Sequence, residues 1–169
     1  MQSSRGELRE LQALIDRGTT SAGPHLRRTF ELPEKALSAE QLTRYWSGGR
    51  RGIALATVTA RGEPRVAPVE ALLRGPVFYV PTARDASRVR HVRARAHVSF
   101  THWVSDRVAV IVHGRARVVS TAEAEFADVD VTYEAGWWSP LRAAGSGVYI
   151  RIDPDRIFTW AADPSALPA

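Results

Sequence analysis

The sequence contains no cysteine, which excludes disulfide bonds, thiolate metal sites and a cysteine nucleophile. Lysine is also scarce, since Lys35 is the only lysine among 23 basic residues. Long apolar runs are missing, and no stretch approaches the roughly 20 residues that a membrane-spanning helix needs. Residues 1–10 are polar and lack the apolar segment of a signal peptide. We therefore expect a cytoplasmic protein that does not bind a membrane.

The chain has 169 residues, of which 44% are hydrophobic and 24% charged, as is ordinary for one globular domain with a substantial core. Its formal net charge is +5. Five arginines fall within twelve residues, opposed there only by Asp85: Arg84, Arg88, Arg90, Arg93 and Arg95. Such a cluster suits an anionic ligand, a nucleic acid or solvent.

Residues 1–50 have a helical pattern. Apolar side chains recur at helical spacing at Leu8, Leu11, Leu14 and Ile15, and Gly18 is a plausible end of that helix. Residues 18–37 contain two prolines and are expected to form an irregular connection. Ser38 and Gln41 form a capping-box pattern for a short helix that ends at Gly48-Gly49.

From Arg51 onward the pattern changes to strands. Six strands are predicted at residues 53–59, 65–73, 77–81, 97–103, 107–119 and 148–160, with a break or bulge at Gly114. A short helix is expected from Asp85 or Ala86, with Val89 and Val92 on its inner face. A second capping-box pattern, Ser120 with Glu123, predicts a helix over about 121–134, and 136–147 is expected to be a loop. Six antiparallel strands with few helices predict a small closed barrel.

Several short motifs follow one another at characteristic spacing. They are Leu55-Ala56-Thr57-Val58, then Gly62, then Pro64-Arg65-Val66-Ala67-Pro68-Val69, then Thr82, then Ala86 to Arg93, then Ala96 to Phe100, and later Val112 to Ala116 and Val148 to Trp160. In this order they resemble the pyridoxamine 5′-phosphate oxidase-like split-barrel family over about residues 38–160. The resemblance implies a mainly β (α+β) fold, a six-stranded antiparallel split β-barrel with short helices. It divides the chain into an N-terminal helical extension, residues 1–37, and a flavin- or deazaflavin-binding domain, residues 38–169.

The short helix that begins near Ala86 is the candidate phosphate site. A helix N-terminus offers free N–H groups and the positive end of the helix dipole. Arg88 takes the place of the family's lysine and can hold a phosphate in bidentate fashion. The predicted phosphate ligands are Arg88 first, then Thr82, Ser87 and Arg84, with Arg90 as a further guanidinium.

The resemblance also implies a place for the cofactor ring. It puts the strand Val66-Ala67-Pro68-Val69 along the ring edge, with Tyr79 and Pro81 near the ring or its tail. Pro68 favours an edge strand because proline gives no ladder donor. Aromatic residues of a partner subunit often complete such sites, and the candidates here are Trp103, Trp137, Trp138 and Trp160.

These features together predict a homodimeric oxidoreductase. It would bind FMN, or alternatively the deazaflavin F420, at the subunit interface and pass hydride to or from a small-molecule substrate. FMN is the preferred candidate because it is the cofactor that more members of the family use. No nucleophile–base pair is recognisable, so no catalytic residue is assigned.

One alternative stays open at this point, a binding protein without catalytic activity. A split barrel can carry or sense a flavin or heme without catalysing a reaction. The five histidines match no metal-binding spacing, so no metal site is predicted. Nucleic-acid binding through the arginine-rich helix is not expected, because residues 82–96 contain no aromatic side chain on which a base could stack.

Overall fold

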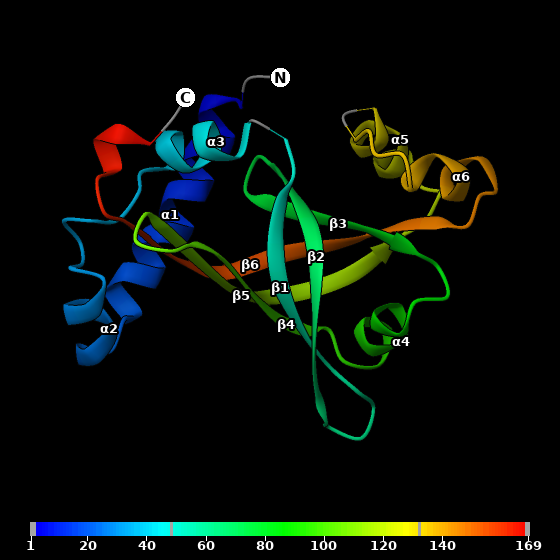
Figure 1. Cartoon of the computed structure of the whole chain (residues 1–169), viewed down its shortest axis with the longest axis horizontal. Helices are drawn as coiled ribbons and strands as arrows, with labels where there is room; N and C mark the ends of the chain where they lie inside the picture. The colour runs from blue at the N-terminus through cyan, green and yellow to red at the C-terminus, as the bar shows by residue number, and fades with distance from the viewer. Residues whose placement is uncertain (1–2, 48, 132, 168–169) are drawn as a thin grey trace.

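The computed structural model describes residues 3–47, 49–131 and 133–167. Its strands are β1 (Arg51–Val58), β2 (Pro64–Arg74), β3 (Val77–Ala83), β4 (His97–Val104), β5 (Val108–Val119) and β6 (Gly147–Ala161). They close into one barrel in the order β1-β2-β3-β6-β5-β4, and every neighbouring pair is antiparallel (Figure 1). The six-stranded antiparallel barrel predicted from the sequence is confirmed.

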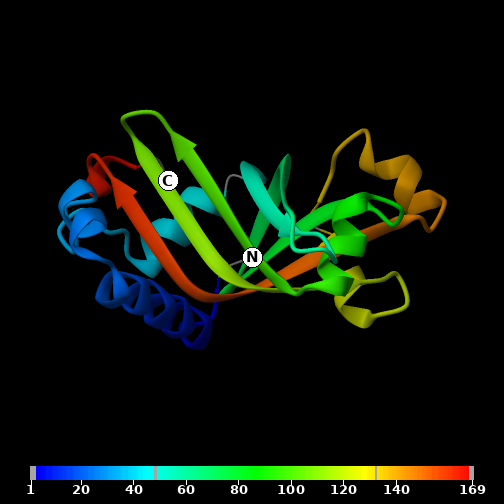
Figure 2. The same cartoon turned by 90° about the horizontal axis from the view of Figure 1, so that it is seen from below.

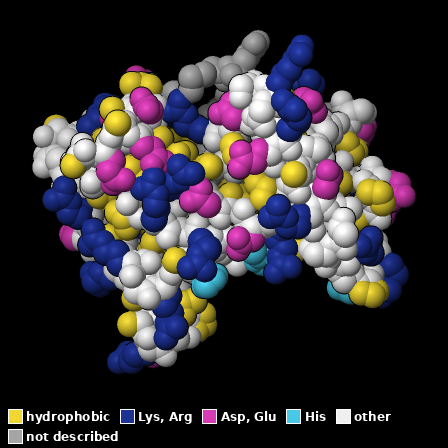
Figure 3. Space-filling view, turned by 180° about the vertical axis from the view of Figure 1, so that it is seen from behind, with side chains coloured by type: hydrophobic (Ala, Val, Ile, Leu, Met, Phe, Trp, Pro, Cys, Tyr) yellow, Lys and Arg dark blue, Asp and Glu magenta, His cyan; other side chains and the backbone are white. Residues whose placement is uncertain are grey.

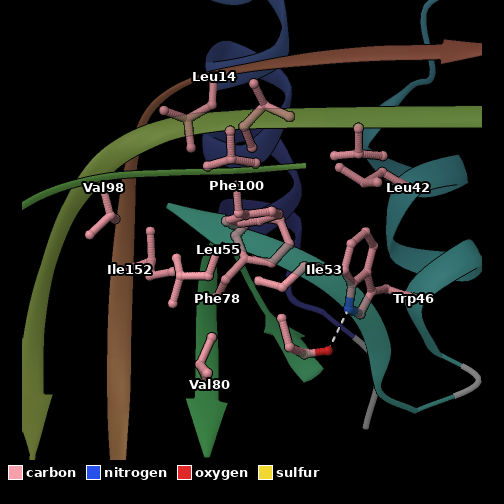
Figure 4. Packing of buried hydrophobic residues seen from close by; sticks show 14 of the residues in the cluster. Leu14, Leu42, Trp46, Ile53, Leu55, Phe78, Val80, Val98, Phe100 and Ile152 are labelled. Carbon is pink, nitrogen blue, oxygen red and sulfur yellow. Dashed lines mark hydrogen bonds between the residues drawn. The ribbon is translucent and has the colours of Figure 1, made fainter. Parts of the chain in front are cut away.

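Alternating side chains fill the barrel. Along β1, Ile53, Leu55 and Thr57 are buried while the residues between them are partly exposed, as the period of a strand requires. Figure 4 shows how Phe78 and Phe100 meet inside the barrel, with ring centroids 4.9 Å apart. The main core is a contiguous cluster that extends from the barrel interior to the helices at one end.

Strand β2 changes partners along its length. Residues Arg51–Val58 of β1 pair with Pro64–Ala71 of β2, whereas the pairing of β2 with β3 is confined to Leu72–Arg74. In the described part of the chain the other edge of β2 is therefore open over 64–71, and Pro68 lies within this open edge. That is where a proline is tolerated, because it costs no ladder hydrogen bond.

The bulge predicted at Gly114 is present. The register between β5 and β6 shifts between His113 and Gly114. A Cβ atom at Gly114 would overlap the backbone carbonyl of Asp153. Glycine is required here because the two strands approach too closely for any side chain.

The helices are α1 (Arg5–Ser21), α2 (Pro24–Thr29), α3 (Ala39–Ser47), α4 (Ser87–Ala94), α5 (Ala124–Asp130) and α6 (Trp138–Ala143), followed by the 3₁₀ turn η1 (Pro164–Ala166). Helices α1 to α3 gather at one end of the barrel, and α5 and α6 at the other (Figure 1). The capping box of Ser38 and Gln41 is confirmed by both of its hydrogen bonds, 2.8 and 3.2 Å long. Among the described residues no helix has both the length and the apolar character to cross a membrane.

Three expectations about the connections were wrong. The segment 18–37 is not wholly irregular, because Pro24 at the first position of α2 begins a short helix there. The loop expected over 136–147 contains α6, and the helix expected over 121–134 is shorter, Ala124–Asp130. Helix α3 ends at Ser47, and Gly48 of the expected Gly48-Gly49 stop lies outside the described residues.

Helix α1 crosses β6 on the outside of the barrel (Figure 2). Leu11, Leu14 and Ile15 are buried in this contact, as their spacing predicted. Gly18 does not end the helix, which continues to Ser21. It is buried where the helix backbone touches β6, and a Cβ atom there would overlap the carbonyl of Ile157.

Helices α5 and α6 cover the outer face of β3, β5 and β6 with a second apolar cluster. Asp130 at the end of α5 fixes this cluster. Its Oδ1 accepts hydrogen bonds from the indole of Trp138 at 2.6 Å and from the hydroxyl of Tyr149 at 3.0 Å. Both donors are buried, so one carboxylate satisfies two polar groups that would otherwise be costly inside the cluster.

Replacement of Gly18 tests the contact between α1 and β6. Gly18→Ala should lower the free energy of unfolding by about 1–3 kcal/mol, because the added methyl group must push the helix away from the strand. The matched control is Gly6→Ala in the same helix, where the new Cβ meets only the Ser4 hydroxyl at 3.8 Å. That control should gain roughly 0.5–1 kcal/mol. Chemical denaturation measures both, and equal stabilities would contradict the close approach.

A buried histidine links α3 to the barrel. Nδ1 of His102 lies 2.8 Å from the carbonyl oxygen of Gly52, and Nε2 lies 2.8 Å from the hydroxyl of Tyr45. A carbonyl can only accept, so Nδ1 carries the proton and Nε2 accepts from Tyr45. Burial, together with the nearby charge of Arg51, lowers the pKa of His102 below 6.5, against the opposing effect of the Gly52 bond. The ring is therefore neutral in the folded protein.

This arrangement predicts acid sensitivity. Because the pKa of His102 is lower in the folded than in the unfolded chain, its stabilisation is complete above about pH 6.5 and is lost as the pH falls toward the folded pKa. The free energy of unfolding should therefore decline as the pH falls below about 6.5. His102→Phe should reduce the slope, whereas His97→Phe at an exposed position should keep it. An unchanged slope in His102→Phe would show that this ring does not cause the decline.

Candidate cofactor site

A cavity of about 200 Å³ lies between β1, the open edge of β2 and helix α4. Its lining residues come from three elements: Leu55 and Thr57 of β1, Arg65, Val66 and Ala67 of β2, and Ser87, Arg88 and His91 of α4. The polar groups on α4 thus face the unpaired part of a strand across a small hollow.

Helix α4 is fixed by two valines. Val89 and Val92 are buried in the main core, as predicted for the inner face of this helix. Ser87 and Arg88 are its first two residues, so the N-terminal end of the helix lies at the cavity. No side chain in the described part of the chain caps this end. Uncapped N–H groups and the helix dipole favour an anion at that position.

Arg88 is held in place by one hydrogen bond, and a second of its donors has no partner among the described residues. Its Nη1 donates to the hydroxyl of Thr82 at 2.6 Å, and Thr82 is 2% exposed. Its Nε is buried and finds no hydrogen-bond partner among the described residues. A buried N–H of a charged group without an acceptor is costly, and a bound ligand would remove that cost.

A second polar pair lies beside Arg88. Nδ1 of His91 is 2.9 Å from Oγ1 of Thr57. Thr57 is buried and His91 is half-buried, so the pair joins α4 to β1 within the cavity wall. Two elements far apart in the sequence are thereby fixed relative to each other.

The structure brings together only some of the residues predicted for the site. Val66, Ala67, Ser87 and Arg88 line the cavity, and Thr82 is joined to it through Arg88. Pro68 and Val69 continue along β2 beyond the cavity lining, Pro68 exposed and Val69 packed against the core.

The remaining predicted residues lie elsewhere. Pro81 is buried in β3, Arg84 donates to the carbonyl of Gly145 at 2.6 Å, and Arg90 donates to the carbonyl of Asp85 at 3.1 Å. Tyr79 belongs to another surface, where its hydroxyl donates to Glu125 at 2.6 Å. Burial and the Glu125 carboxylate raise the pKa of Tyr79 to about 12. None of the four lines the cavity described above.

Tyr79 lines a larger groove, of about 620 Å³, between α1, β3, α5 and β6. The charged groups at its floor satisfy one another: Arg151 donates to Glu125 at 2.7 Å and to Asp153 at 2.6 Å. Figure 3 shows arginine and acidic side chains intermingled on the back of the molecule. Because Arg151 is bonded to two carboxylates, it presents no unpaired positive charge to an anionic ligand.

The four tryptophan candidates fall into different environments. Trp138 is fully buried beneath α5, and Trp160 is half-buried with its indole N–H lacking a partner in the described residues. Trp103 at the end of β4 is 62% exposed, and Trp137 is 48% exposed. Only the last two present a large apolar surface outward.

Sequence reasoning did not assign four of the lining residues to the site: Leu55, Thr57, Arg65 and His91. The sequence contained a signal for two of these four residues, Thr57 and His91. Thr57 occupies the third position of the L-A-T-V motif, next to the motif assigned to the ring. His91 follows Arg88 by three residues, which puts both on one face of a helix.

The closed antiparallel barrel of six strands with short helices at its ends defines a split-barrel protein. The profile of the family described as pyridoxamine 5′-phosphate oxidase matches residues 44–161. The chain therefore belongs to this family. No curated protein compared with the sequence matches it.

Solved structures share the fold at low sequence identity. A conserved hypothetical protein from Mycobacterium tuberculosis aligns with a TM-score of 0.61 at 19% identity, covering 81% of this chain and 92% of its own. HutZ, the heme storage protein from Vibrio cholerae, aligns at 0.59 and 16% identity, covering 72% and 93%. A protein named F420 reductase aligns at 0.52 and 20% identity, covering 63% and 88%. At these identities the likeness shows the fold alone.

Proposed function

We propose that this protein is an oxidoreductase that binds FMN, with the phosphate between Arg88 and the N-terminus of α4. The single observation that carries this proposal is the buried Nε of Arg88, which has no acceptor among the described residues. A phosphate oxygen at this point would satisfy it. Such charge-assisted bonds are among the stronger ones in proteins.

The geometry of the guanidinium fits this role. Thr82 occupies Nη1, so the edge formed by Nε and Nη2 is left for the ligand. That edge can hold two oxygens of one phosphate group at once. Ser87 lines the same cavity, and its hydroxyl and the uncapped amides at the start of α4 would supply further donors.

The open edge of β2 supports a place for the ring. Val66, 69% exposed, and Ala67 line the cavity from a stretch whose outer backbone edge has no strand partner in the described chain. Free backbone groups there can meet the polar edge of a flavin ring. The flavin, when bound, supplies the hydride chemistry, and the protein binds and orients it against a small-molecule substrate.

The deazaflavin F420 is the second candidate, favoured by the arginines around α4. Arg84, Arg90 and Arg95 donate to backbone carbonyls, and in the described chain none of them, nor Arg93, forms an ion pair with a carboxylate. Their charge is therefore not neutralised locally. F420 carries an acidic polyglutamate tail beyond its phosphodiester, and such a tail would match this surface.

Charge reversal at Arg88 tests the phosphate site. Arg88→Glu should weaken FMN binding by tenfold to more than a hundredfold, because it removes a charge-assisted bond worth about 1.5–3 kcal/mol and adds a like charge. The matched control is Arg90→Glu on the same helix, whose guanidinium donates to the Asp85 carbonyl and does not line the cavity. Titration of each apo-protein with FMN and with F420 provides the measurement.

The outcomes of that titration separate the candidates. Tighter binding of F420, with a steep loss of affinity in salt, would make F420 the cofactor. Unchanged affinity of Arg88→Glu for both would remove Arg88 from the site. A Soret band in the purified protein, in place of a flavin spectrum, would favour a heme-binding protein that catalyses nothing and would contradict the proposal.

We also propose that the protein acts as a homodimer whose second copy covers the open side of the cofactor cavity. Large apolar side chains are exposed at three positions: Val66 beside the cavity, and Trp103 and Trp137 elsewhere. A two-fold interface is the commonest way to bury such surface. Light scattering at micromolar concentration should give twice the chain mass. A monomer mass would contradict the dimer and, with it, a cofactor site shared by two copies.

A further inference from the structure

The cavity holds one more donor that the proposed function does not use. His91 lies three residues after Arg88 on α4 and lines the same cavity. Its Nδ1 is engaged with the hydroxyl of Thr57 at 2.9 Å, and the ring makes no other hydrogen bond in the described part of the chain. The ring is thus anchored on one side, and its Nε2 remains available to a ligand.

Thr57 can set the tautomer of this ring. A hydroxyl can donate or accept, and a neutral imidazole has one nitrogen of each kind. When the Thr57 hydroxyl donates to Nδ1, the ring proton must lie on Nε2. Nε2 then becomes an N–H donor in the same cavity as the unsatisfied Nε of Arg88. Thr57 is 4% exposed, so water competes little for its hydroxyl.

The other candidates for this role are already engaged. Arg65 lines the cavity from β2, but it donates to Glu63 at 2.8 Å and to the carbonyl of Pro64 at 2.9 Å. His102 has both ring nitrogens bonded within the core. Among the described lining residues, His91 is the ring whose second nitrogen is left uncommitted.

We propose that Thr57 and His91 form a second binding element for the cofactor phosphate. The Thr57 hydroxyl donates to Nδ1, and Nε2–H donates to a phosphate oxygen that Arg88 holds from the other side. The inference rests on the proposed function and deepens it, since it makes His91 a binding residue and Thr57 its positioning residue. An N–H donor beside the guanidinium adds a second directed contact to the phosphate.

The experiment compares FMN with riboflavin, which has the same ring and no phosphate. His91→Phe keeps a flat ring but loses the donor, and it should weaken FMN binding about tenfold or more while riboflavin affinity stays at the wild-type value. His91→Gln, which keeps an N–H donor, should restore part of the loss. The control His97→Phe, on β4 and outside the cavity lining, should leave both affinities unchanged.

Thr57 is tested in the same way. Thr57→Val keeps the shape and removes the hydroxyl, so it should weaken FMN binding a few-fold, whereas Thr57→Ser should bind as the wild type. Nitrogen-15 NMR of the labelled histidine should show the proton of His91 on Nε2 in the FMN complex. A proton on Nδ1 in that complex would overturn the proposal without any substitution. If the protein binds F420, then F420 and its phosphate-free chromophore replace FMN and riboflavin.

Failure of this inference can be told apart from failure of the proposed function. If Arg88→Glu loses FMN while His91→Phe keeps it, the phosphate site stands and His91 has no part in it. If His91→Phe weakens FMN and riboflavin equally, the ring only supports the structure, and the inference is wrong. If Arg88→Glu also leaves FMN affinity unchanged, the proposed phosphate site itself is wrong.

Discussion

The change of partner along β2 is the constraint on which the site depends. A strand that pairs on both sides has no backbone groups left for a ligand. Here β2 pairs with β1 over 64–71, but with β3 only over Leu72–Arg74, so much of the strand keeps a free edge inside an otherwise closed barrel. Helix α4 packs against the core through Val89 and Val92 and thereby holds Arg88 opposite this edge. The cavity lies where this edge of β2 is left unpaired beside α4.

The barrel could be predicted from local patterns, because buried and exposed side chains alternate along a strand with a period of two residues. This alternation can be recognised in the sequence without knowing which strands pair. Gly114 marked its bulge for a similar reason, since glycine weakens the interior of an apolar strand and is typical there of a bulge. Gly18 was misinterpreted as the end of α1, because a glycine inside a helix signals either an end or a close contact. The strand that touches it, at Ile157, is more than a hundred residues away in the sequence. Sequence spacing alone holds no information about that contact.

Sequence spacing also does not report which distant segments meet, and for this reason only some of the predicted site residues lie together. Ser87 and Arg88 lie together because they share one helix, and Val66 and Ala67 share one strand. Tyr79 was assigned to the site from the order of the motifs, but strand alternation places it opposite to Phe78 and Val80, which face the main core. It therefore packs beneath α5 and donates to Glu125. The order of the motifs thus brought four predicted residues to one cavity, whereas the alternation of side chains along β3 turned Tyr79 to another face.

The arginines Arg151, Arg117 and Arg88 differ in the kind of partner that holds them. Arg151 and Arg117 are each bonded to carboxylates, and Glu125 is shared by both, so their charge is balanced within the fold. Arg88 is instead held by a neutral hydroxyl, which fixes its orientation and leaves its charge unneutralised. A guanidinium fixed in this way loses little side-chain entropy when an anion arrives, because the fold has already immobilised it. The bond to Thr82 would therefore favour binding of the proposed phosphate even though it contributes no charge.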